Sequence, residues 1–325
     1  MKILEILEKI ANQNIIVIGD VMIDAYLWGN VNRISPEAPV PIVSVTKRES
    51  RLGGAANVAL NLKSLGLKPI VCSVIGEDDG GELFMNLMQE NSLLQEGVLQ
   101  TKTRKTTKKT RVISSGQQLL RVDDEISYSL TADIEKQFID RVVQIIRETK
   151  ITAIIFEDYD KGVISENVIQ QITQIALEQS IPTTVDPKKE NYNFYRDITL
   201  FKPNFKEFRE GAKLDILKAD TQAIFENAKK IISEKNIKYV FVTLSELGVF
   251  ITDGKSYYQI PAEFRQIRDV SGAGDTVISV ATLLLSLNVD IKTIASVSNI
   301  AGGLVCEKVG VVPITKIDLE NAFTV

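Results

Sequence analysis

Histidine is absent from the 325 residues of the sequence, and cysteine occurs only twice, at Cys72 and Cys306. The lack of histidine excludes Ser-His-Asp and Cys-His catalysis and any zinc site with histidine ligands. The two cysteines stand far apart in apolar surroundings, which predicts buried free thiols in a reducing cytoplasm rather than a disulfide. Acid–base chemistry near neutral pH therefore falls to carboxylates, lysine or tyrosine.

Long hydrophobic runs are missing as well. No apolar stretch approaches the roughly 20 residues that a membrane-spanning helix needs. Residues 1–10 carry acids within an apolar stretch, so they predict a short amphipathic helix and not a secretion signal. The net charge of −4 argues against a protein that coats nucleic acid. We therefore expect neither a membrane nor a nucleic acid as partner.

Short apolar runs alternate with amphipathic segments along most of the chain. Runs typical of strands buried on both faces occur at residues 15–20, 69–75, 153–156, 183–185, 200–201 and 239–243. Helical periodicity occurs at residues 57–65, 81–90, 132–149, 165–179, 221–235 and 274–287. This alternation predicts a single doubly wound α/β domain over residues 1–325, with a mostly parallel sheet flanked by helices.

Two segments break this rhythm, at approximately residues 25–47 and 98–125. Both mix polar and apolar residues without a helical period, so we expect β-hairpins inserted into the α/β domain. Such hairpins could pair into a small β-sheet that covers one end of the main sheet. Ligands bind outside the carboxyl ends of strands in α/β sheets, so this small sheet would serve as a lid.

The strongest chemical signal is the segment 269–276, which reads DVSGAGDT and leads into an apolar helix. Gly272, Ala273 and Gly274 leave backbone N–H groups open at the helix start, where the helix dipole adds positive charge. These groups would form an anion site for a phosphate in transfer. Asp275 would lie beside that site and could take a proton from a hydroxyl. Considered alone, the segment is also compatible with a glycine turn and a capping aspartate.

Two further segments lie near the first predicted strand. Gly53 and Gly54 open a helix and would let a ligand approach the backbone, while Asn57 could hydrogen-bond a hydroxyl. Asp24 follows the strand, where a carboxylate could accept hydrogen bonds from a sugar diol. A tight turn for the glycines and a capping role for the aspartate are comparably good interpretations.

Two segments in the second half of the chain could serve a nucleotide. Asn204 and Glu207 stand three apart at a strand-to-helix junction, where Glu207 could hold Mg²⁺ through water. The same pair would form a helix-capping box, and both interpretations could be true together. Ser245 and Gly248 follow a strand and could face a phosphate, although a simple turn is the favoured interpretation when they are considered alone.

Basic residues concentrate in the segment 104–111, which reads RKTTKKTR. The default interpretation is the solvated face of a lid strand. A phosphate on the substrate would give these residues a function, and Arg33 and Arg121 are further candidates for it. Nucleic-acid binding is disfavoured because no aromatic residues are interleaved with the run.

These segments occur in the order and spacing of the ribokinase-like (PfkB) carbohydrate kinases, which the chain resembles over almost its whole length. The resemblance rests mainly on two motifs, GGAAN at residues 53–57 and DxxGAGD at residues 269–275. The resemblance implies an ATP- and Mg²⁺-dependent sugar kinase. It implies that Asp275 is the base and that residues 272–274 form the anion hole. The resemblance also implies which residues bind the sugar, namely Asp24, Gly53, Gly54 and Asn57. Contacts to the sugar or its phosphate would come from Arg33, Arg121, Lys161 and Asp158. Mg-ATP would be bound by Asn204 and Glu207, and the nucleotide pocket would be lined by Ser245, Gly248 and Asn299.

One subgroup, the kinase domains of bacterial ADP-heptose synthesis enzymes, is similar in five segments, at residues 19–24, 33–41, 117–123, 158–162 and 186–188. This similarity implies phosphorylation of D-glycero-D-manno-heptose 7-phosphate at O1. Full-length members carry a nucleotidyltransferase domain with a His-x-Gly-His motif. This sequence has no histidine, so we expect a separate protein to supply that step. Exposed lid edges would also favour a homodimer.

Three other functions are weighed against this one. The same fold could act on another sugar, sugar phosphate or nucleoside, because Val270 and the Phe-Glu pair before Asp158 depart from the pattern. A sugar or nucleotide sensor without catalysis is disfavoured by the presence of Asp275. An NAD-dependent enzyme is excluded because no Gly-x-Gly-x-x-Gly follows the first strand.

Overall fold

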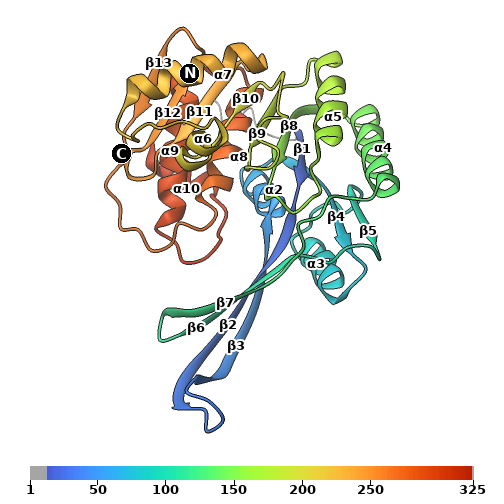
Figure 1. The fold of residues 1–325 in the computed structure, drawn as a ribbon, viewed down its shortest axis with the longest axis vertical. Coiled ribbons are helices and arrows are strands. Elements are labelled where there is room, and N and C mark those ends of the chain that lie inside the picture. The colour runs from blue at the N-terminus through green and yellow to red at the C-terminus, as the bar shows by residue number, and fades with distance from the viewer. Residues whose placement is uncertain (1–12, 324–325) are drawn as a thin grey trace.

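The computed structural model describes residues 13–323, which form two β-sheets with helices around the larger one (Figure 1). The helix predicted at residues 1–10 lies outside this range. The larger sheet contains β1 (Asn14–Gly19), β4 (Lys68–Gly76), β5 (Val98–Thr101), β8 (Ile151–Glu157), β9 (Thr183–Asp186), β10 (Leu200–Phe201), β11 (Tyr239–Thr243), β12 (Val249–Thr252) and β13 (Tyr257–Ile260). The smaller sheet contains β2 (Val21–Ile34), β3 (Pro41–Gly54), β6 (Lys108–Ser114) and β7 (Gln117–Asp124).

The strand order in the larger sheet is β13-β12-β11-β10-β9-β8-β1-β4-β5. All neighbours are parallel except at one edge, where β12 is antiparallel to both β11 and β13. The helices are α2 (Ala55–Ser64), α3 (Asp79–Glu90), α4 (Ala132–Glu148), α5 (Glu166–Glu178), α6 (Phe205–Gly211), α7 (Thr221–Lys235), α8 (Ala273–Ser286), α9 (Ile291–Cys306) and α10 (Lys316–Ala322). The predicted α/β fold with a small additional sheet is therefore confirmed.

The core lies on both faces of the larger sheet. Along β1, Ile15 and Val17 pack with α2, α8 and α9, whereas Ile16 and Ile18 pack with α4, α5 and α7. All four side chains have no exposed surface. Burial on both faces explains why the central strands are continuous apolar runs without alternation. None of the helices within residues 13–323 is both long and apolar enough to cross a membrane.

The smaller sheet, called the lid below, has the order β3-β2-β6-β7 and projects from the rest of the molecule as a long ribbon (Figure 1). Strands β2 and β3 form one antiparallel hairpin, β6 and β7 form another, and β2 and β6 pair in parallel. Two predicted boundaries are wrong. The first hairpin begins at Val21 and ends at Gly54, beyond the predicted 25–47, so it joins β1 and α2 directly. Residues 98–101 are β5, which pairs with β4 at the edge of the larger sheet because Val98 and Thr101 are buried there.

Candidate active site

Asp275 lies in the first turn of α8 and is 6% exposed. The amide Nδ2 of Asn57 donates to its Oδ2 over 2.6 Å, and the hydroxyl of Tyr159 donates to its Oδ1 over 2.9 Å. Burial raises the pKa of Asp275 above its usual value, and the two hydrogen bonds offset part of this effect. The result is a fixed carboxylate with enhanced basicity, which is what proton abstraction from a hydroxyl requires.

The turn before Asp275 depends on Gly272, which caps α8 in the left-handed conformation with φ of 80°. A Cβ at this position would lie 3.0 Å from Nδ2 of Asn57, so a larger residue would disturb the partner of Asp275. Because the first N–H groups of a helix have no partner within it, the backbone of Gly274 can receive an anion. The N–H of Ala273 donates to the carbonyl oxygen of Val270 over 3.3 Å. The structure thus brings the predicted anion hole and base together.

The predicted sugar-binding residues adjoin this turn from the opposite side. Gly53 packs so closely against Asp24 that a Cβ would lie 2.2 Å from its carboxylate Oδ2. Gly54 has φ of 59°, and its added Cβ would lie 2.3 Å from the carbonyl oxygen of Asp20. Asp24 is buried and forms an ion pair of 2.6 Å with Arg111 of the lid. Asp24, Gly53, Gly54 and Asn57 therefore form a continuous wall where the lid joins the larger sheet.

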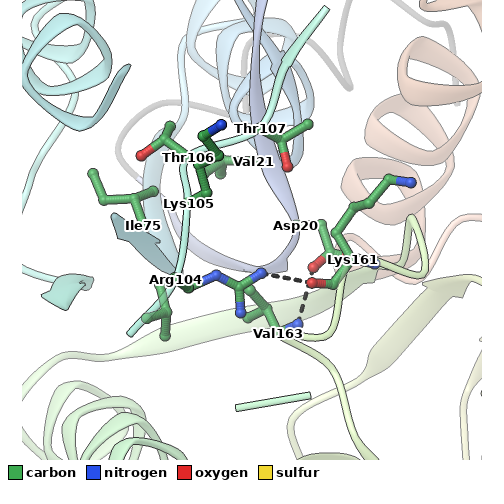
Figure 2. Close-up of a pocket in the computed structure, with 10 residues that line it drawn as sticks. Asp20, Val21, Ile75, Arg104, Lys105, Thr106, Thr107, Lys161 and Val163 are labelled. Atoms are coloured by element: carbon green, nitrogen blue, oxygen red, sulfur yellow. Dashed lines mark hydrogen bonds between the residues drawn. The ribbon is translucent and has the colours of Figure 1, made fainter. Parts of the chain in front are cut away.

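Asp20 fixes the loop of residues 158–163 that follows β8. Its Oδ2 accepts hydrogen bonds from the N–H groups of Tyr159 and Lys161, and its Oδ1 accepts one from Val163. Figure 2 shows this loop beside Arg104, whose Nη2 donates to the carbonyl oxygen of Lys161 over 2.6 Å. Arg104 also borders a cavity of about 10 Å³, enough space for one water molecule. Asp20 is thus an anchor for the loop that carries Tyr159.

The assignment of Asp158 as a sugar contact is wrong. This residue has no exposed surface, and its Oδ2 accepts hydrogen bonds from Asn191 and from the hydroxyl of Tyr195. Its Oδ1 accepts from the N–H of Asp160. A side chain that is enclosed and bonded in this way stabilises the loop and does not face a ligand.

The predicted basic contacts separate into two groups. Lys161 forms an ion pair of 2.8 Å with Glu125 at the root of the lid. Arg121 is the cross-strand partner of Arg111, so both project from the lid face that carries Asp24. Arg33 is in register with Ile42 near the outer end of the first hairpin, and the structure does not bring it to Asp275.

Asn204 and Glu207 form a complete capping box at the start of α6. Glu207 Oε2 accepts from the N–H of Asn204, and its Oε1 accepts from Nζ of Lys188 over 2.5 Å. Within residues 13–323, no group of three or more His, Cys, Asp or Glu side chains is arranged to hold a metal ion. The remaining lone pairs of Glu207 fit an ion held through water better than one bound directly.

A second, much larger cavity of about 690 Å³ lies beside the start of α8. Its lining includes the predicted residues Ser245, Gly248 and Asn299, and also Ala273 and Gly274 of the anion hole. Phe264 borders the same cavity and is fully exposed. A mostly apolar cavity of this size that ends at an anion hole can accept a nucleotide, with its phosphates at α8.

Five polar residues of the site were not predicted as functional: Tyr159, Glu157, Asp186, Lys188 and Lys202. Arg111 belongs to the basic run 104–111, for which a substrate phosphate was the alternative to a solvated lid face. Lys202 forms a buried ion pair of 2.7 Å with Asp186, close to Gly274. Glu157 has no exposed surface, and its carboxylate oxygens have no hydrogen-bond partner among the described residues. Burial, followed by the charge of Asp186, raises its pKa well above the usual value. The position of these residues could have identified them from the sequence. Glu157, Asp186 and Lys202 each end or follow a parallel strand of the larger sheet, where ligands bind in α/β folds.

Comparison with known proteins adds a family match. A family model described as pfkB family carbohydrate kinase matches residues 12–317. The match includes both glycine motifs and every residue of the site described above.

Individual relatives are similar over most of the chain. The bifunctional protein HldE of Methylobacillus flagellatus is 38% identical over 94% of this chain and 62% of its own length. The protein of the same name from Helicobacter pylori strain J99 is 39% identical over 92% of this chain and 64% of its own length. The chain thus spans about three-fifths of the curated relatives it matches.

Solved structures are similar in fold. The structure of phosphofructokinase-2 from Escherichia coli in complex with potassium has a TM-score of 0.79. The alignment is 20% identical and covers 97% of this chain and 98% of that one. The same enzyme in complex with fructose-6-phosphate has a TM-score of 0.78 at 20% identity, with 97% and 98% of the two chains covered.

Proposed function

Because the chain belongs to the pfkB family of carbohydrate kinases, we propose that it transfers the γ-phosphoryl group of ATP to O1 of D-glycero-D-manno-heptose 7-phosphate. The product would be the 1,7-bisphosphate, a precursor in ADP-heptose and lipopolysaccharide core synthesis. The motifs at residues 33–41, 117–123 and 158–162 support this substrate, since they resemble those of heptose-phosphate kinases.

One observation carries the proposal: Asp275 stands between a nucleotide-sized cavity and the inner face of the lid. The cavity of about 690 Å³ reaches Ala273 and Gly274, directly before Asp275. On the other side, Asn57 joins Asp275 to the wall formed by Gly53 and Asp24. A phosphate donor in the cavity and a hydroxyl at this wall would meet at the base, as in-line transfer requires.

Each residue then has a chemical role. Asp275 accepts the proton of the attacking hydroxyl as the new O–P bond forms. The N–H groups of residues 272–274 stabilise the oxygens of the transferred group. When bound, Mg²⁺ supplies positive charge to the phosphates, and Glu207, with Asn204 placing its helix, would hold the ion through water. Asn299, Ser245 and Gly248 would line the nucleotide, and Phe264 is available to cover its base.

A phosphorylated substrate fits the charge of the lid. Lys109 and Arg111 on β6 and Arg121 on β7 lie on the face that carries Asp24, and Lys161 lies at the lid root. Each of these cations lies beside a carboxylate that holds it in place. The sugar phosphate would compete with these carboxylates for the cations. Arginine and lysine favour phosphate through charge-assisted hydrogen bonds. An unphosphorylated sugar would have no group of opposite charge for these cations.

The setting of the reaction completes the proposal. ATP and two buried free cysteines, Cys72 and Cys306, suit the cytoplasm. The lid would pair with that of a second copy, because Leu120 and Val122 are 50% and 53% exposed on the face opposite Arg111.

A substrate panel tests the function. The chain is supplied with Mg-ATP and with heptose 7-phosphate, fructose 6-phosphate, ribose or a nucleoside, and kcat/KM is measured from ADP release. Heptose 7-phosphate should give the highest value, and ³¹P NMR should show the new phosphate at the anomeric carbon. A preference for an unphosphorylated sugar would overturn the substrate assignment.

A further inference from the structure

The proposed reaction gives no role to the Tyr159 hydroxyl, although this hydroxyl contacts the catalytic carboxylate. It donates to Asp275 Oδ1 over 2.9 Å, while Asn57 donates to Oδ2 over 2.6 Å. Because Asp275 is only 6% exposed, the remaining lone pairs of both oxygens face mostly protein. An acceptor hydroxyl must donate to one of these oxygens before it can lose its proton. Tyr159 therefore stands where that hydroxyl has to arrive.

Tyr159 is a permanent donor. Burial, followed by the charges of Asp275 and Glu157, raises the pKa of its hydroxyl well above the usual value. The hydroxyl keeps its proton at every pH at which the protein works. A carboxylate that accepts hydrogen bonds from two such donors is a weaker base than one with a free oxygen.

The tyrosine is fixed through its backbone and linked to the lid through its ring. Its N–H donates to Oδ2 of Asp20. Nη2 of Arg104 donates to the carbonyl oxygen of Lys161 in the same loop (Figure 2). Nζ of Lys109, on lid strand β6, lies 6.0 Å from the ring centroid, within the range of a cation–π contact. Lys161 joins the loop to Glu125 at the root of the lid. A sugar that draws these two lysines to its phosphate would also change the surroundings of Tyr159.

We propose that Tyr159 is a positioning residue that caps Asp275 until the sugar binds, so that phosphate is transferred to sugar and not to water. The inference rests on the proposed kinase reaction. The sugar hydroxyl displaces the tyrosine from Oδ1 and gives its proton to Asp275. Its oxygen then bonds to the γ-phosphorus as the bond to the ADP oxygen breaks. Water alone has no contacts with the lid lysines and leaves the cap in place.

A matched pair of variants tests the cap. Tyr159→Phe removes the hydroxyl from Asp275, and Tyr195→Phe removes a buried hydroxyl that donates to Asp158 over the same 2.9 Å. ADP release from Mg-ATP is measured without any sugar. Loss of one hydrogen bond should raise this hydrolysis by roughly tenfold in Tyr159→Phe and leave it unchanged in Tyr195→Phe. Equal hydrolysis in Tyr159→Phe and the unsubstituted chain would overturn the proposal.

Two further readouts separate positioning from a merely structural role. The double variant Tyr159→Phe, Asp275→Asn should return to background hydrolysis, because the uncapped group is the base. In Tyr159→Phe, the acid limb of the hydrolysis profile reports an Asp275 that has lost one donor. It should lie at higher pH than the acid limb of sugar-dependent kcat/KM in the unsubstituted chain, which reports the capped free enzyme. Persistent hydrolysis in the double variant contradicts the cap.

The unsubstituted protein provides a test that needs no tyrosine variant. Without sugar, its ATP hydrolysis should be no faster than that of Asp275→Asn, and faster hydrolysis would also overturn the cap. These assays contain no sugar, so they stand apart from the substrate panel. A wrong heptose assignment changes the panel and leaves the hydrolysis results as they are.

Discussion

At the scale of single residues, the site is organised around the two oxygens of Asp275. Each oxygen has one named donor, Asn57 or Tyr159, and the surrounding charges come from Asp186 and Lys202. Burial makes the carboxylate a stronger base, while the donors and Lys202 limit this effect. The pKa of Asp275 is raised overall, which favours acceptance of a proton from a hydroxyl.

Replacement of Asp275 by asparagine should nearly abolish turnover. The change keeps the shape of the side chain and removes the proton acceptor, so kcat should fall roughly 10²- to 10⁴-fold. Nucleotide affinity, measured by calorimetry, should change little because the cavity is lined by other residues. Unchanged kcat in this variant would contradict the role of Asp275 as base.

The pH dependence of kcat/KM should report the same carboxylate. Only ionised Asp275 can accept a proton, so activity should fall as pH decreases through its pKa. Since burial raises that pKa, the fall should begin at a higher pH than for an exposed aspartate. Steady-state kinetics across pH checks this, with thermal melting at each pH as control for unfolding.

At the scale of secondary structure elements, the proposed catalysis depends on how α8 begins. Gly272 holds a left-handed turn that directs the first N–H groups of the helix toward the cavity. The same turn places Asp275 against Asn57 of α2, which follows the lid hairpin. One glycine thus aligns the proposed anion hole, the proposed base and the proposed sugar wall.

Gly272→Ala should reduce both stability and turnover. A left-handed alanine costs about 1–2 kcal/mol, and its Cβ would press on the amide of Asn57. The matched control is Gly66→Ala, which also has a positive φ but no atom within 4 Å of the added Cβ. Urea unfolding should show a loss in both variants, whereas kcat should fall only in Gly272→Ala. A normal kcat in both would argue against the role of this turn.

The sequence predicted the elements that follow simple patterns. Strands buried on both faces are unbroken apolar runs, so β1, β4, β8 and β11 were identified directly. The edge strands β12 and β13 have four residues each and were missed. Helix α9 was missed because its own residues are apolar or small on most of its faces, so the sequence shows little helical periodicity. β5 was assigned to the lid because pairing partners cannot be derived from a four-residue run.

Prediction of the site followed the same logic. Asp275, Asn57 and the glycines carry local signatures, and the structure brings them together. Tyr159 and Lys202 have no such signature, because their contacts join strands that are distant in sequence. Asp158 shows the opposite error. Its place after a strand suggested a ligand, yet packing turned its carboxylate toward Tyr195.

At the scale of the whole molecule, the lid has two different faces. One carries Asp24, Arg111 and Arg121 toward the site, and the other carries Leu120 and Val122. Alternation along a strand separates the two sets. Near the lid root, Ile23 and Ala25 of this second face are buried in the core. Leu120 and Val122 are half exposed, and they would be buried in the proposed homodimer.

Val122→Lys should convert the proposed dimer to a monomer. It places a charge on the exposed apolar face, and an unpaired charge is costly to bury. Leu217→Lys is the control, because Leu217 is 77% exposed and lies outside the lid. Sedimentation velocity should show a dimer for the unsubstituted chain and the control and a monomer for Val122→Lys. A monomeric unsubstituted chain at micromolar concentration would refute the dimer.

The hydrogen bond between Asn57 and Asp275 spans 218 positions of the chain. During synthesis, the ribosome completes the first lid hairpin and α2 long before it reaches α8. A nascent chain would therefore hold half of a sugar site and no base, and it could not consume ATP. Contacts of such long range form slowly. On refolding from urea, phosphotransfer should return only with the last kinetic phase, after most helical signal has recovered.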